Sequence, residues 1–196
     1  LHLCHHNLES IDTKSMTTHD LLLEVCYAAK YEGNSINTHY TKHERTNEGS
    51  QLCTVLARSF ADIGDIVRGK DLFLGNTYES AQRKQLDKKL KTIFKKIHKE
   101  VTTNAKNVNK QSLQERYKDD DKKNFFQLRE DWWYANRATV WKAITCNAGS
   151  GKYFRQTCGD SGSPSMVRDK CRCKDKNGSP DDQVPTYFDY VPQYLR

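Results

Sequence analysis

The sequence predicts a mostly α-helical, cysteine-rich bundle with long loops stapled by disulfides. Apolar residues recur at helical spacing over residues 52–67 and 86–101. All three tryptophans fall within residues 131–146, in a chain of which 29% is charged. Seven cysteines occur without a Cys-x-x-Cys pair, which favours structural disulfides in an oxidising compartment over a zinc site.

The length of 196 residues allows one sizeable core or two small lobes. We expect residues 1–75 to form a first lobe and the start of a helical core, and residues 76–196 to form the rest of that core with cysteine-rich loops. No run approaches the roughly 20 apolar residues of a membrane span, so we expect no membrane insertion. The N-terminus does not resemble a signal peptide, and the C-terminus stops directly after an aromatic cluster. Both ends therefore look cut, and we expect the chain to be a piece of a larger protein.

The net charge of +7 indicates anionic partners in general, such as nucleic acid, acidic glycans or a membrane surface. No recognised nucleic-acid motif is present, and the aromatic residues are not interleaved with the lysines, so no nucleic-acid partner is expected.

The first predicted helix begins at Thr17 or Thr18, with Asp20 placed for a capping contact. Gly33 is expected to end it as a glycine just past the last turn. The polar stretch 34–49 shows no period and is predicted to be a surface loop. Ser50 is then expected to cap the second helix, and Gly69 to end it.

The third predicted helix runs from about Tyr78 to Val101 and has an apolar stripe with a basic face opposite it. Candidate binding residues on the basic side are Arg83, Lys84, Lys88, Lys91, Lys95, Lys96 and Lys99. Lysines at this spacing suit a sulfated or phosphorylated polymer. Any exposed helix in a lysine-rich protein has such a face, so the pattern alone leaves solvated charge equally open.

A short helix is predicted around Leu113, and then a long helix that Asn124 caps and that carries the tryptophans. Arg129 and Arg137 fall inside or beside its apolar face, where a guanidinium needs a carboxylate or carbonyl partner. We expect Arg137 to form a structural ion pair with Asp62 or Asp65 of the second helix. Residues 147–182 are expected to be loops.

Residues 159–164 nearly reproduce the nucleophile loop of trypsin-like serine proteases. That chemistry needs a double β-barrel and a buried Asp that orients a His, whereas the chain before this loop is helical. We interpret the match as chance and expect no enzyme activity and no cofactor. The Cys4-His5-His6 run has no matching second cluster, so no metal is expected either.

Residues 56–75, 131–146 and 187–196 together strongly resemble the alpha-class Duffy-binding-like domain, the head domain of the variant erythrocyte membrane protein adhesins of Plasmodium falciparum. The resemblance covers essentially the whole chain. It implies a cysteine-rich helical adhesion domain on the extracellular face of the infected erythrocyte membrane, as part of a larger anchored protein. It also implies a further C-terminal helical subdomain, absent here.

The resemblance implies that the partners are host erythrocyte or endothelial surface receptors. In rosetting, these receptors include sulfated glycans of the heparan-sulfate type and blood-group sugars. The resemblance therefore favours the basic helix face as a glycan site. The alternative is an antigenically variable structural or decoy module with no dedicated ligand. We expect Cys158 to pair with one of Cys171 and Cys173, Cys53 with the other, and Cys26 with Cys146, leaving Cys4 over.

Overall fold

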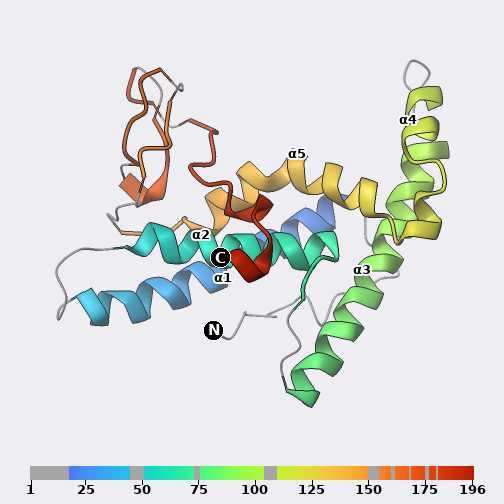
Figure 1. Cartoon of the computed structure of the whole chain (residues 1–196), viewed down its shortest axis with the longest axis horizontal. Helices are drawn as coiled ribbons and strands as arrows, with labels where there is room; N and C mark the ends of the chain where they lie inside the picture. The colour runs from blue at the N-terminus through green and yellow to red at the C-terminus, as the bar shows by residue number, and fades with distance from the viewer. Residues whose placement is uncertain are drawn as a thin grey trace.

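Helices α1 (Thr18–Glu44), α2 (Leu52–Arg68) and α5 (Phe126–Ile144) lie side by side and form the body of the molecule (Figure 1). α1 and α5 run in the same direction and pack directly on each other, and α2 runs in the opposite direction and packs against both (Figure 1). α3 (Thr77–Thr103) crosses one end of this body, with α4 (Lys110–Arg116) beside it.

The computed structural model describes residues 18–44, 51–72, 76–103, 110–149, 155–159, 162–167, 169–174, 177–179 and 181–196. Within these ranges the regular structure is helical, which confirms the predicted fold class. Short 3₁₀ turns supplement the helices at Asp120–Lys123 (η1), Asp169–Cys171 (η2), Phe188–Tyr190 (η3) and Gln193–Leu195 (η4). No described helix has the length and apolar character needed to cross a bilayer.

The prediction that Gly33 ends the first helix is wrong, because α1 continues to Glu44. A Cβ on Gly33 would lie 1.9 Å from the carbonyl oxygen of Ile144, so the glycine lets α1 and α5 approach closely. Residues 34–44 are therefore helical rather than loop. The polar part of α1 is held by the residues just after α5, because the Asn147 side chain donates a hydrogen bond to the Asn34 side chain at 3.0 Å.

α2 is buried along most of its length and forms the centre of the core. Phe60 packs against the rings of Trp133 and Trp141, with centroids 5.1 and 5.2 Å away. As predicted, Gly69 ends the helix in the left-handed conformation, at φ 72°. The predicted cap Ser50 lies outside the described residues.

The predicted cap of the tryptophan helix, Asn124, is wrong. Asn124 and Phe125 both have positive φ, and α5 begins at Phe126. The two carboxylate oxygens of Asp120 instead accept from the backbone N–H groups of Gln127 and Leu128, both at 3.0 Å. A buried aspartate at the start of a helix satisfies unpaired donors and complements the positive end of the helix dipole.

Two disulfides fasten the C-terminal loops. Cys53 of α2 bonds to Cys171, and Cys158 bonds to Cys173, which is one of the two arrangements expected for these four residues. The first bond ties the loop region directly to the buried α2. The second closes a small loop that also contains an antiparallel bridge between Cys158 and Ser165.

The expected Cys26–Cys146 disulfide is not formed, and both thiols are free. The parallel register of α1 and α5 explains this, because residue 147 lies level with Asn34. Cys26 is eight residues before Asn34, or about 12 Å along the helix axis, whereas bonded cysteines need Cα atoms within roughly 7 Å. Burial raises the pKa of the Cys26 thiol to about 11, so it is unreactive near neutral pH. Cys4 lies outside the described residues.

Candidate binding surface

The basic face belongs to α3, a helix capped by a reciprocal pair that the sequence reading missed. The Asn76 side chain accepts from the Glu79 backbone N–H at 2.9 Å, and the Glu79 carboxylate accepts from the Asn76 N–H at 3.3 Å. The predicted apolar stripe is buried, and Phe94 meets Trp132 edge to face at 6.1 Å. This packing fixes which side of α3 faces solvent.

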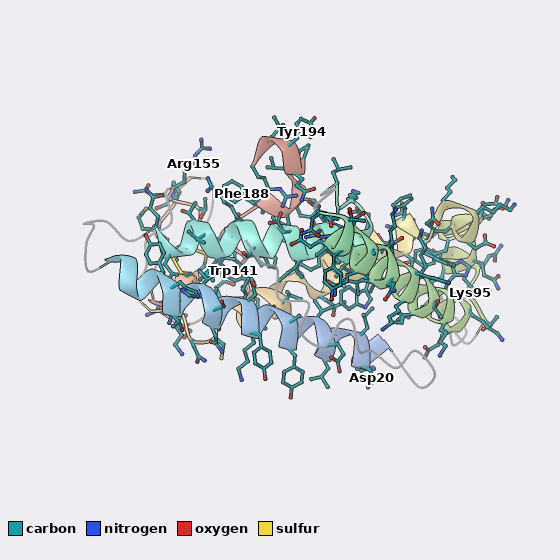
Figure 2. The ribbon with its side chains drawn as sticks, turned by 90° about the horizontal axis from the view of Figure 1, so that it is seen from below. Asp20, Lys95, Trp141, Arg155, Phe188 and Tyr194 are labelled. Atoms are coloured by element: carbon teal, nitrogen blue, oxygen red, sulfur yellow. A yellow bond between two sulfur atoms is a disulfide. The ribbon has the colours of Figure 1, made fainter. Side chains whose placement is uncertain are left out.

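The opposite side of α3 carries a straight row of lysines at four- and three-residue steps, which we call the lysine row. The row consists of Lys84, Lys88, Lys91, Lys95 and Lys99. All but Lys91 are exposed. Lys95 lies on the outer side of α3, away from Trp141 and the packed helices (Figure 2). Lys96 is also exposed but lies about a quarter turn off the row.

Arg83 does not belong to this exposed face. Its guanidinium forms a short ion pair with Asp71, and both side chains are mostly buried, at 14% and 15% exposed. Asp71 also accepts from the Gln193 side chain at 3.2 Å. Arg83 therefore anchors the start of α3 to the segment after α2 and to the C-terminal turn.

Lys91 is also engaged. It pairs with Asp87 one turn earlier, at 2.8 Å, and the same carboxylate accepts from Arg129 at 3.2 Å. Arg129 is fully buried and stacks over Phe94 at 5.3 Å. Its burial lowers its pKa and Asp87 opposes that effect. The i, i+4 spacing of Asp87 and Lys91 was a signal for this pair in the sequence.

A hollow of about 270 Å³ adjoins the start of the lysine row. Lys84, Ser80 and Leu86 line it from α3, and Gly69 lines it from the end of α2. The hollow contains Asp87 as well as cations, so its charge is mixed. The exposed lysines, rather than this hollow, give the surface its positive character.

Arg137 forms a structural ion pair, but the predicted partners Asp62 and Asp65 are wrong. Its Nε and Nη2 donate to the two carboxylate oxygens of Asp189, both at 2.8 Å. The same carboxylate accepts from Trp133 Nε1 at 2.9 Å and has no exposed surface. The motif 187–196 thus folds back onto α5, and its central aspartate satisfies the buried cation.

Asp62 and Asp65 instead hold Arg196. The guanidinium donates to Asp62 at 3.1 Å and makes a shorter contact with Asp65. Asp65 also pairs with the buried Arg68 at 2.9 Å. Burial raises the pKa of Asp62 to about 6, although Arg196 opposes that effect. These contacts make the aspartates of α2 an anchor for the C-terminal segment.

A family model described as the Duffy binding domain matches residues 1–196. The chain belongs to this family. Its solved structural neighbours include the NTS-DBL1(alpha-1) domain of PfEMP1 from the Plasmodium falciparum varO strain, with 40% sequence identity and a TM-score of 0.70. A double domain of the varO protein, NTS-DBL1-alpha with CIDR-gamma, matches with 40% identity and a TM-score of 0.72.

A more distant neighbour is the DBLb domain of a PfEMP1 protein bound to human ICAM-1, with 26% identity and a TM-score of 0.58. Each match covers 99% of this chain, but only 40% of the NTS-DBL1(alpha-1) structure, 25% of the double domain and 36% of the DBLb domain. This Duffy binding domain chain therefore spans well under half the length of the solved relatives. A search of curated proteins found no match.

Proposed function

We propose that this chain is an adhesion domain, without enzyme activity, that binds receptors on host erythrocytes or endothelial cells. It acts on the extracellular face of the infected erythrocyte as part of a larger anchored protein. The exposed lysines of α3 contact sulfated glycans of the heparan-sulfate type. Family membership supports the adhesive role, and the relative bound to human ICAM-1 shows that one such domain engages a host surface protein.

The observation that carries the glycan proposal is the exposure of Lys84, Lys88, Lys95 and Lys99 on one side of α3. None of the four forms an ion pair with a carboxylate in the part of the chain that the structure describes. A polyanion that meets them displaces counterions, and this gives salt-sensitive binding.

The test is retention on a heparin column of the triple variant Lys88→Glu, Lys95→Glu and Lys99→Glu. A control variant changes three exposed lysines elsewhere, Lys30, Lys118 and Lys123, to glutamate, so both variants have the same net charge. We expect the row variant to elute at much lower salt than the wild type and the control variant to elute close to it. Equal shifts for both variants would show that only net charge matters and would refute the proposed site.

A further inference from the structure

The unpaired charges of the lysine row form two separate pairs. Lys84 and Lys88 are four residues apart, as are Lys95 and Lys99, so the Cβ atoms within each pair lie about 6 Å apart. Seven residues separate Lys88 from Lys95, a rise of about 10 Å. The whole row spans about 22 Å along the axis.

Lys91 lies in the gap between the two pairs, and it is held by Asp87, which is level with Lys88 on the helix. Lys91 and Asp87 bond at 2.8 Å, and their side chains are 40% and 39% exposed, so a ligand on the row would meet this neutral pair. Asp87 is also fixed in place, because the fully buried Arg129 needs it as a partner. Lys91, at the centre of the row, is therefore already paired with a carboxylate that cannot move away.

Distance determines whether the two pairs act together on one anion. The Debye length at physiological ionic strength is about 8 Å, longer than the spacing within a pair and shorter than the gap between pairs. Two lysines about 6 Å apart attract one anionic group jointly. Lysines across the gap are screened from each other, so each pair attracts its own anionic group.

We propose that the row binds a sulfated glycan at two points, with one sulfate cluster on each lysine pair and a poorly sulfated stretch over the Asp87–Lys91 ion pair. This inference rests on the proposed function and specifies its ligand. A chain long enough to reach both pairs binds the second one intramolecularly, which raises its affinity well above that of either half. A uniformly dense chain places a sulfate against Asp87 and gains less.

The experiment measures the dissociation constants of heparin oligosaccharides of graded length by titration calorimetry. For the wild type, we expect a rise in affinity of at least tenfold over a narrow length interval, where the oligosaccharide first spans about 22 Å. The variants Lys84→Glu/Lys88→Glu and Lys95→Glu/Lys99→Glu each lose this step and bind short oligosaccharides weakly. Circular dichroism and thermal unfolding check that these surface changes leave the fold intact.

A matched pair of single variants tests whether Lys91, in the middle of the lysine row, contributes little to binding. Lys91→Met and Lys95→Met remove the same charge, but Lys91 is already paired with Asp87, so we expect Lys95→Met to weaken binding several-fold more. A smooth rise of affinity with length, or equal losses for these two variants, overturns the two-point inference while the proposed function stands. If the wild type binds no heparin oligosaccharide, the proposed function and this inference both fail.

Discussion

Gly33 lies where α1 packs against the end of α5, and this packing requires a residue without a side chain. Replacement by alanine puts a Cβ 1.9 Å from the Ile144 carbonyl oxygen, which is backbone and cannot turn aside. We expect Gly33→Ala to destabilise the fold by about 2 kcal/mol or more, despite the higher helix propensity of alanine. Urea unfolding measures the change.

Gly149 provides the control for this substitution, because a Cβ there meets nothing within 4 Å. Gly149→Ala is expected to change the free energy of unfolding by less than about 0.5 kcal/mol. Equal effects of the two substitutions would contradict the close approach of α1 and α5.

Asp62 makes the free energy of unfolding depend on pH, in a direction that its pKa determines. Burial raises the pKa of its carboxyl to about 6 from an ordinary value of 3.8, and Arg196 only partly opposes this. The folded state then binds the proton more tightly than the unfolded state, so this term lowers stability as the pH rises from about 4 to 6.

We therefore expect Asp62→Asn, which mimics the protonated form, to stabilise the protein at pH 7.5 by on the order of 1–2 kcal/mol. The difference from the wild type should shrink as the pH falls from about 6 to about 4, where the wild-type carboxyl becomes protonated. Thermal unfolding followed at several pH values measures it. A variant that is less stable at pH 7.5 would show that the ion pair with Arg196 outweighs the cost of burial.

At the residue scale, the sequence indicated which side chains needed partners but not which partners they have. Arg137 had to be paired because it lies on an apolar face, yet Asp189 is 52 residues away and pairs with it only through the fold. Asp62 and Asp65 were reasonable candidates by spacing, but Arg196 occupies them. Long-range ion pairs depend on how chain segments return to the core, and periodicity carries no such information.

At the scale of elements, the two disulfides constrain loops of very different size. The cysteines of the Cys53–Cys171 bond are 118 residues apart in sequence, whereas those of Cys158–Cys173 are 15 apart. The chain-entropy model assigns about 5 kcal/mol to the first and about 3 kcal/mol to the second. We expect the Cys53→Ser/Cys171→Ser variant to lose more stability than Cys158→Ser/Cys173→Ser, as measured by thermal unfolding.

The long-loop bond also fastens the C-terminal region to α2, whereas the short one acts within that region. Hydrogen exchange should therefore rise across the α2–loop contact in the first variant and only locally in the second. A larger loss of stability in the variant without the Cys158–Cys173 bond would contradict this division.

Helix positions followed from periodicity, but helix ends depended on tertiary contacts. The apolar steps of α2 and α3 were sufficient to locate both helices. The predicted end of α1 was wrong because Gly33, a residue type that often ends a helix, instead allows α1 and α5 to pack closely. The absent Cys26–Cys146 bond likewise follows from the parallel register of α1 and α5, which neither helix encodes by itself.

At the scale of the whole molecule, packing and binding are assigned to different surfaces. The tryptophans and Arg137 lie in the body, where Asp189 accepts from Trp133 and Arg137. The aspartates of α2 lie there too and hold Arg196. The exposed lysines lie on the side of α3 opposite its buried stripe. α3 crosses one end of that body (Figure 1). Surface lysines can be exchanged without disturbing the core, so variation in this row is expected to alter binding and leave the fold intact.

The most direct test of the adhesive role uses human erythrocytes and the fluorescently labelled chain, measured by flow cytometry. We predict that the wild type and the Lys30/Lys118/Lys123 control variant bind, that soluble heparin competes with them, and that the Lys88/Lys95/Lys99 variant does not bind. Binding by the Lys88/Lys95/Lys99 variant equal to that of the wild type, with no competition by heparin, would contradict the account.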